Sequence, residues 1–240
     1  MRKGKQGFTL IELMIVIAII AIIAAIAIPG LLSSQRASNE RSASTSLKTL
    51  STAEADFRAN DRDWNHVNDF WTGNVAGLYT MTSAAVTGNN ANTTTDQAIK
   101  LIELSVAAAD SDGTTPAAGN ENAAVSTFAV PSPKSSYWYM ALFTDATLGA
   151  TLEATYRQDT QGQPTMGSVH NTSKFGFISF PDSQSAGKSV FIVNENNTIF
   201  RSATSGFTRP VGTPPGTSLG AAYVAWPDDA NLKSFWSKLD

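Results

Sequence analysis

The sequence predicts an α+β protein in which a long amino-terminal helix, composed of a membrane half and an amphipathic stem, packs on an antiparallel β-sheet head. Residues 8–32 are almost wholly apolar, and residues 33–58 contain no glycine or proline. The last hundred residues hold short segments rich in aromatic and β-branched residues, separated by turn-forming residues. A helical first quarter followed by strand-forming segments is typical of a helix laid on a sheet. The length of 240 residues fits one folded unit with an appendage.

The composition excludes several classes of protein. The chain has no cysteine, which excludes disulfide bonds, cysteine-ligated zinc and thiol catalysis. Its 17 basic and 20 acidic residues give a formal net charge of -3, so it lacks the basic surface that nucleic-acid binding needs. We therefore expect that no nucleic acid is required as a partner.

The first 32 residues predict a single membrane-spanning helix. The first six positions carry three basic residues and no acidic one, whereas residues 8–32 carry one charge, on Glu12. As a helix, this stretch spans about 37 Å, enough to cross a hydrocarbon core of about 30 Å. The positive charges predict a cytoplasmic amino terminus, with everything after Leu32 on the other side of the membrane. They belong to Arg2, Lys3 and Lys5.

Three interpretations of this segment are open on its residues alone. It is a plain single-pass anchor, or a signal peptide cleaved after the small residues of Ala25–Ala27, or a segment that uses Glu12. A carboxylate inside the apolar stretch costs a few kcal/mol unless it is paired or neutralised. The first two interpretations tolerate Glu12, and only the third explains it.

The run Gly7-Phe8-Thr9-Leu10-Ile11-Glu12 resembles the processing site of type IV pilins and of type II secretion pseudopilins. The resemblance implies that residues 1–7 are a leader peptide, that a prepilin peptidase cuts between Gly7 and Phe8, and that Phe8 is then N-methylated. It assigns Glu12 to subunit assembly and matches Pro29 to the family's proline.

The resemblance implies a structural rather than enzymatic function. We expect a subunit of a type IV pilus-like filament, assembled as a helical homopolymer by dedicated machinery, with the precursor held in the inner membrane and the filament in the periplasm or at the cell surface. One alternative is a pseudopilin of a type II secretion system. Another is a membrane-anchored calcium-dependent or carbohydrate-binding module. No cofactor is required for the main interpretation.

Physical chemistry supports these assignments. An ammonium group on Phe8 and the carboxylate of Glu12 are each costly in lipid, whereas a pair formed between neighbouring subunits neutralises both. Pro29 removes a backbone donor and clashes with the preceding turn, which predicts a kink or local melting at Pro29 and Gly30.

Residues 33–60 predict a stem helix with one buried and one wet face. Apolar residues recur at intervals of three and four, flanked by charged ones. The apolar stripe is Ala43, Leu47, Leu50, Ala53 and Phe57, and the flanking charges are Arg41, Lys48, Glu54, Asp56 and Arg58.

An oxygen-rich loop follows the stem and partly resembles a calcium-binding loop. Oxygen side chains fall at loop positions 1, 3, 5 and 9, and position 7 supplies a backbone carbonyl. The glycine and the final glutamate of an EF-hand loop are replaced by His66 and Thr72. The alternative is an Asx-rich loop that only forms turns. The possible calcium ligands are Asp61, Asp63, Asn65, Val67 and Asp69.

Residues 61–240 form the predicted globular head, with a loop-rich insert at 82–126 that holds one short helix at 96–109. Strands are predicted at 137–143, 175–180 and 190–193, and a hairpin turn at 194–197 leads into a further strand. The tail from residue 226 is expected to hold itself in place through Phe235, Trp236 and Leu239.

The sequence predicts no enzyme. Ser185 and Lys188 have a spacing used by some hydrolases, but a polar turn explains them better. His66 and His170 lie in separate polar segments without an evident shared partner. The assembly helix explains the specific signal without chemistry.

Overall fold

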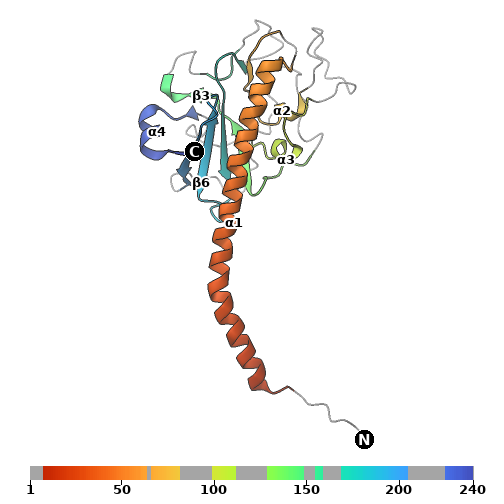
Figure 1. The fold of residues 1–240 in the computed structure, drawn as a ribbon, viewed down its shortest axis with the longest axis vertical. Coiled ribbons are helices and arrows are strands. Elements are labelled where there is room, and N and C mark those ends of the chain that lie inside the picture. The colour runs from red at the N-terminus through yellow and green to blue at the C-terminus, as the bar shows by residue number, and fades with distance from the viewer. Residues whose placement is uncertain are drawn as a thin grey trace.

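The computed structural model consists of one long helix, α1 (Leu10–Asn60), with a β-sheet head packed along its carboxyl-terminal half (Figure 1). The helix has 51 residues and is therefore about 77 Å long. The structure describes residues 8–63, 66–81, 99–111, 129–148, 155–158, 169–204 and 225–239. This arrangement confirms the predicted α+β layout.

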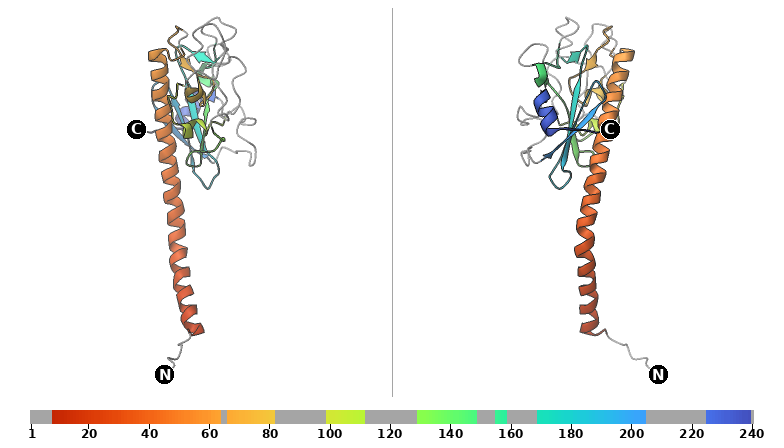
Figure 2. Two further views of the ribbon diagram at one scale, coloured as in Figure 1. Left: turned by 90° about the vertical axis from the view of Figure 1, so that its right-hand side faces the viewer. Right: turned by 60° about the vertical axis from the view of Figure 1, so that its left-hand side comes forward.

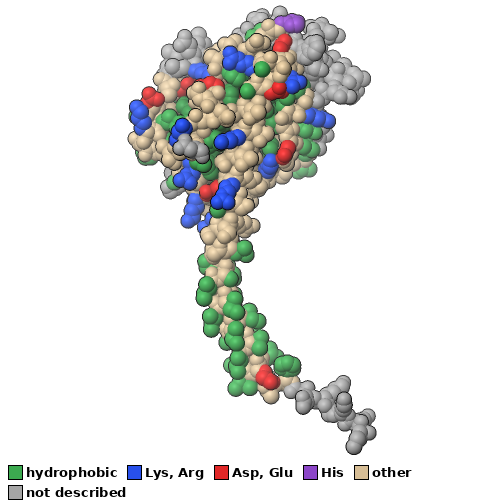
Figure 3. Space-filling model, viewed as in Figure 1, with side chains coloured by type: hydrophobic (Ala, Val, Ile, Leu, Met, Phe, Trp, Pro, Cys, Tyr) green, Lys and Arg blue, Asp and Glu red, His purple; other side chains and the backbone are tan. Residues whose placement is uncertain are grey.

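The amino-terminal half of α1 projects away from the head as an apolar shaft. It is long and apolar enough to cross a membrane, judged by length and composition. Its large side chains are exposed, from Phe8 at 85% to Ile15 at 54% and Leu32 at 45%. Apolar side chains cover the shaft, whereas basic side chains gather on the head (Figure 3). An apolar surface of this kind is stable only when lipid or protein covers it.

The helix continues through Pro29 without interruption. Its lower part curves gently (Figure 1), and the helix is continuous at Pro29 and Gly30, so the local melting that the proline could cause does not occur. The hydroxyl groups of Ser33 and Ser34 both donate to the carbonyl of Gly30, at 2.9 and 3.1 Å. Both hydroxyls thus bond back to a carbonyl one turn earlier in the helix, a conformation of serine that often accompanies helix bending.

The head is built on a five-stranded antiparallel sheet with the order β2-β5-β6-β7-β9. Short connections at 182–188 and 195–198 join β5, β6 and β7, and Figure 2 shows the sheet running alongside the upper part of α1. The carboxyl-terminal strand closes one edge by pairing with β7. The strands are β2 (Tyr137–Ala141), β5 (Gly176–Pro181), β6 (Ser189–Asn194), β7 (Ile199–Ala203) and β9 (Ser237–Leu239).

Both faces of the sheet are covered, because side chains alternate between two apolar clusters along each strand. On β6, Phe191 and Val193 point toward α1, whereas Val190 and Ile192 point to the opposite face. The whole predicted stem stripe lies in the cluster on the α1 side. Strands buried on both faces have continuous apolar sequences, which explains why the strand segments show little polar alternation.

Short elements complete the head. The pair β1 (Phe70–Trp71) and β4 (His170–Asn171) is antiparallel, and β3 (Thr144–Asp145) pairs in parallel with β8 (Ala225–Trp226). The remaining elements are α2 (Gly77–Thr80), α3 (Leu104–Ala107), the 3₁₀ turn η3 (Ala146–Leu148) and α4 (Asp229–Phe235).

Three details differ from the sequence predictions. The helix expected at 96–109 is only the four residues of α3, and residues 96–98 lie outside the described part of the chain. Within the expected surface insert, Val106 and Ala107 are buried in the core, because apolar residues in this short segment pack below α2. In the tail, Leu239 packs on the core, but Phe235 is 69% exposed.

The turn between β5 and β6 holds the stem from outside the core. Arg36 Nε donates to the carbonyl of Ser185 at 2.9 Å, and Asn39 Nδ2 donates to that of Ala186 at 3.0 Å. The backbone N–H of Lys188 donates to Glu40 Oε1 at 2.9 Å. Residues 185–188 therefore form a turn that fixes the point where α1 leaves the head.

Truncating the stem stripe is expected to destabilise the head. Leu50 is fully buried between α1 and the sheet, so Leu50→Ala should lower the free energy of unfolding by about 2–5 kcal/mol. Thr49→Ala, one residue away on the exposed face, should change it by less than about 0.5 kcal/mol. Chemical denaturation of the detergent-solubilised chain measures both. Equal losses in the two variants would mean that the helix does not dock through this stripe.

Candidate functional site

Thr9 and Glu12 form a reciprocal cap at the amino end of α1. The Glu12 N–H donates to Thr9 Oγ1 at 3.4 Å, while Glu12 Oε2 accepts from the Thr9 N–H at 2.9 Å and from the Thr9 hydroxyl at 2.7 Å. This is a capping box, which satisfies backbone donors at a helix start. Sequence reasoning missed it, although the Thr-x-x-Glu spacing is its usual signal.

Glu12 is the one charge in an exposed apolar surface. Its neighbours Leu10, Ile11 and Leu13 are between 58% and 76% exposed. Figure 3 shows an acidic side chain near the free end of the shaft, surrounded by apolar ones. Gly7 and the rest of the leader lie outside the described residues, so cleavage at Gly7 and methylation of Phe8 stay predictions.

The structure places the proposed calcium ligands in different local surroundings. Asp61 caps the carboxyl end of α1 in the left-handed conformation, and its Oδ2 accepts from the His66 N–H at 3.1 Å. Asn65 lies outside the described residues, and the Val67 carbonyl accepts from the Asp69 N–H at 3.0 Å. Asp63 and Asp69 turn inward, and both are buried. A calcium site through all five residues remains a prediction.

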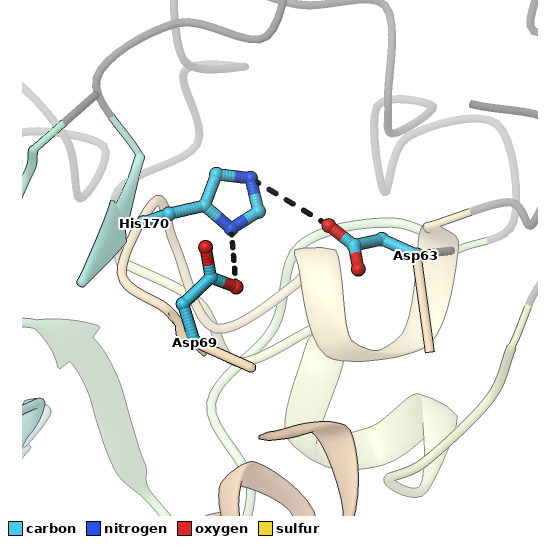
Figure 4. Close-up of side chains that lie close together, drawn as sticks. All are labelled: Asp63, Asp69 and His170. Carbon is cyan, nitrogen blue, oxygen red and sulfur yellow. Dashed lines mark hydrogen bonds and ion pairs between the residues drawn. The ribbon is translucent and has the colours of Figure 1, made fainter. Parts of the chain in front are cut away.

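The carboxylates of Asp63 and Asp69 lie close to the imidazole of His170, a contact that the sequence did not indicate. Asp69 Oδ1 lies 3.2 Å from His170 Nδ1, and Asp63 Oδ2 lies 3.9 Å from His170 Nε2 (Figure 4). All three side chains are at most 1% exposed. We call Asp63, Asp69 and His170 the Asp-Asp-His cluster.

Three elements bring the cluster together. Asp63 follows the end of α1, Asp69 directly precedes β1, and His170 lies in β4 opposite Trp71 of β1. Aromatic rings enclose the imidazole, with the Phe57 centroid at 6.4 Å and the Trp71 centroid at 5.4 Å. His170 is 101 residues from Asp69 in sequence, so no local spacing indicated that they meet.

Glu54 is a fourth buried ionisable group beside the cluster. The sequence analysis placed it on the wet flank of the stem, which is wrong, because Glu54 is 0% exposed. The Trp71 N–H donates to its Oε2 at 3.0 Å, while its Oε1 has no hydrogen-bond partner among the described residues. Loss of hydration raises the pKa of Glu54 well above its ordinary value, and His170 and Asp69 also act on it electrostatically.

The buried position of Glu54 could have been predicted from helical spacing. Glu54 follows Leu50 by four residues and precedes Phe57 by three, so it lies within the apolar stripe rather than beside it. A charged residue inside a buried stripe indicates a specific partner.

Comparison with known proteins places the specific similarity in the amino-terminal region. Residues 2–28 match the family model described as the prokaryotic N-terminal methylation motif. The type IV major pilin protein PilA of Myxococcus xanthus (strain DK1622) is 58% identical over 52 residues, which are 22% of this chain and 24% of that protein. The match therefore spans about a quarter of the relative's length. No solved structure matches the chain.

The amino-terminal segment thus matches a methylation motif of the kind that its residues predicted, and it is similar to the amino-terminal region of a type IV pilin. The motif coincides with the exposed shaft of α1, and the similarity to the pilin lies in this region. The head agrees with the expectation in its α+β layout and in the positions of strands β2, β5, β6 and β7.

The pH dependence of stability is expected to report the burial of Glu54. A carboxyl group with a raised folded-state pKa adds stability that is fully present below its unfolded pKa, near 4.5, and is lost as the pH rises toward the folded pKa. Glu54→Gln imitates the protonated form, so wild type should lose stability relative to this variant as the pH rises above about 4.5. Urea unfolding at several pH values measures the difference.

Glu103→Gln is a control for which the expected change of stability with pH has the opposite sign. The hydrogen bond from Lys134 lowers the pKa of the exposed Glu103, so its contribution is present above the unfolded pKa and lost as the pH falls. This variant should lose a small amount of stability at neutral pH. A wild-type to Glu54→Gln difference that is independent of pH would show that Glu54 is ionised in the folded chain.

Proposed function

We propose that this chain is a structural subunit of a type IV pilus-like filament and not an enzyme. The observation that carries the proposal is that the methylation motif at residues 2–28 overlaps the exposed, apolar amino-terminal half of α1. A surface of this kind needs a cover, and a helical bundle of identical shafts provides one after the chain leaves the lipid.

The proposal includes the membrane as a storage site. The precursor is held in the inner membrane by residues 8–32, with the basic leader in the cytoplasm and the head on the other side. A prepilin peptidase then cuts between Gly7 and Phe8, Phe8 is methylated, and assembly machinery moves the subunit into the filament. The curved shaft and the head at its far end fit a bundle with apolar helices inside and heads outside (Figure 2).

Electrostatics gives Glu12 its part in assembly. Among the described residues of the single chain, its carboxylate accepts hydrogen bonds from Thr9, and it lies in an apolar, exposed surface. In a bundle of shafts it faces apolar neighbours, and an unpaired charge there costs a few kcal/mol. A new ammonium group on Phe8 of an adjacent subunit neutralises it, which favours one axial register over others.

Two substitutions of Glu12 separate its charge from its capping function. Glu12→Gln keeps an oxygen that can accept from Thr9 but removes the charge, whereas Glu12→Ala removes both. If the charge pair drives assembly, each variant should lower the yield of sheared filaments by about tenfold or more, since a factor of ten corresponds to about 1.4 kcal/mol. Immunoblots of sheared fractions and of membranes measure yield and total subunit.

Glu40→Gln is the matched control, because Glu40 lies on the same helix but contacts the head. It should leave filament yield near wild type. Wild-type yield from Glu12→Gln would refute charge pairing while leaving a capping function. Wild-type yield from both Glu12 variants would refute any part for Glu12.

The sheared-filament assay, together with a gene deletion and a ligand-binding measurement on the head, distinguishes the alternative functions. Long surface filaments favour a pilus. Their absence, together with stalled protein secretion when the gene is deleted, favours a type II secretion pseudopilus. A head that binds a ligand but never polymerises favours a membrane-anchored binding module.

A further inference from the structure

We propose that the side chains of Lys174 and Asp145 condense in the folded head into an amide cross-link, with release of one water molecule. The inference does not depend on filament assembly, because both residues lie within one chain. The bond would tie the segment just before β5 to β3. The chain contains no cysteine, so a disulfide bond cannot serve this purpose.

The first observation is that Lys174 and Asp145 form a largely buried ion pair. Lys174 Nζ lies 3.4 Å from Asp145 Oδ2, and the two side chains are 14% and 12% exposed. Aromatic residues surround the pair, since the ring centroid of Tyr156 lies 5.5 Å from Lys174 Nζ and Trp226 is opposite Asp145 in the pairing of β3 with β8. Charged groups lose hydration in such surroundings, and condensation removes both charges at once.

The second, independent observation concerns the other oxygen of the Asp145 carboxylate. Asp145 Oδ1 accepts from the Thr147 N–H at 3.0 Å and from the Thr147 hydroxyl at 2.5 Å. When an amine adds to a carboxyl carbon, negative charge develops on the oxygen that stays bound, and fixed donors at that oxygen stabilise it. One carboxylate oxygen is thus held by two donors, while the amine faces the other.

The backbone positions of both residues are fixed. The Lys174 N–H donates to Asn171 Oδ1 at 3.0 Å, and Asn171 lies fully buried in β4. Asp145 is held by the pairing of β3 with β8. Two well-oriented groups in one molecule react as though each were present at about 10⁵ M or more. This high effective concentration favours an amide that would not form between free groups in water.

The step balances without a third reactant. Lys174 Nζ first gives one proton to Asp145 Oδ2, which leaves a neutral amine beside a carboxylic acid. The nitrogen lone pair then forms a bond to the carboxyl carbon, and Oδ1 carries the negative charge of the intermediate. The bond from carbon to Oδ2 breaks, and Oδ2 leaves as water with a second proton from Nζ. The product is a neutral secondary amide, and nothing is oxidised or reduced.

A second lysine–carboxylate pair shows what the first one has in addition. Lys134 Nζ lies 3.0 Å from Glu103 Oε2, but the Glu103 side chain is 70% exposed. Water keeps both of these charges hydrated, so an ion pair at the surface gains little from losing them. Burial, aromatic surroundings and the donors of Thr147 therefore distinguish the pair at Lys174 from an ordinary surface ion pair, and Lys134 provides a matched control.

Tryptic peptide mapping of the detergent-solubilised full chain detects the bond directly. Asp145 lies in the tryptic peptide 135–157, and Lys174 ends the peptide 158–174. An amide on Lys174 removes the charge that trypsin recognises and so blocks cleavage after it. We expect one branched species that joins 135–157 to 158–188 and weighs one water molecule less than the two peptides together.

Lys174→Arg separates the covalent bond from the ion pair. Arginine keeps a positive charge beside Asp145, but its guanidinium stays protonated and cannot attack the carboxyl carbon. The variant should lose the branched species. Its melting temperature should be lower by about 5–10 °C, because the bond in wild type closes a loop between residues 29 positions apart in sequence. Lys134→Arg, the control, should keep the branched species and the wild-type melting temperature.

The wild-type peptide map decides even if Lys174→Arg fails to fold, and Asp145→Ala gives a second variant without a carboxyl group to attack. Separate peptides 135–157 and 158–174 from the folded wild-type chain would overturn the proposal and leave only an ion pair. A branched species that persists in Lys174→Arg or in Asp145→Ala would place the cross-link elsewhere. Loss of the branched species in Lys134→Arg would do the same.

Discussion

The structure depends on the burial of one continuous helix in two different surroundings. The carboxyl-terminal half of α1 docks its apolar stripe on the sheet, whereas the amino-terminal half carries apolar side chains with no cover inside the chain. The docked half of the helix is therefore covered by the head, whereas the shaft needs a cover of lipid or of other protein. Pro29, the serines that follow it and the turn at 185–188 lie where these surroundings meet.

The features that could be predicted from sequence are those that depend on local patterns. Apolar spacing identified the stem stripe from Ala43 to Phe57, and runs of aromatic and β-branched residues identified the main strands. The motif around Glu12 identified the amino-terminal segment, because its meaning lies in consecutive residues. Each signal comes from residues that contact their own neighbours or one face of a single element.

The features that could not be predicted depend on contacts between distant segments. His170 joins Asp63 and Asp69 only because β4 pairs with β1, and two-residue strands leave no periodic pattern. The sequence predicted a helix around Val106, but the burial of this residue depends on packing of the short α3 against distant parts of the core. Glu54 is a different case. Its spacing places it in the buried stripe, but it was assigned to the exposed flank because it is a charged residue type.

The most direct test of the central claim is the mass of the amino-terminal peptide of the protein from its native cell envelope. The account predicts a chain that begins at N-methylated Phe8, since the apolar shaft with its new ammonium group is the unit that assembles. A chain that begins at Ile28 would contradict it, because removal of a signal peptide would destroy the shaft. An intact Met1 in filament-free membranes would also contradict it and would leave α1 as an anchor alone.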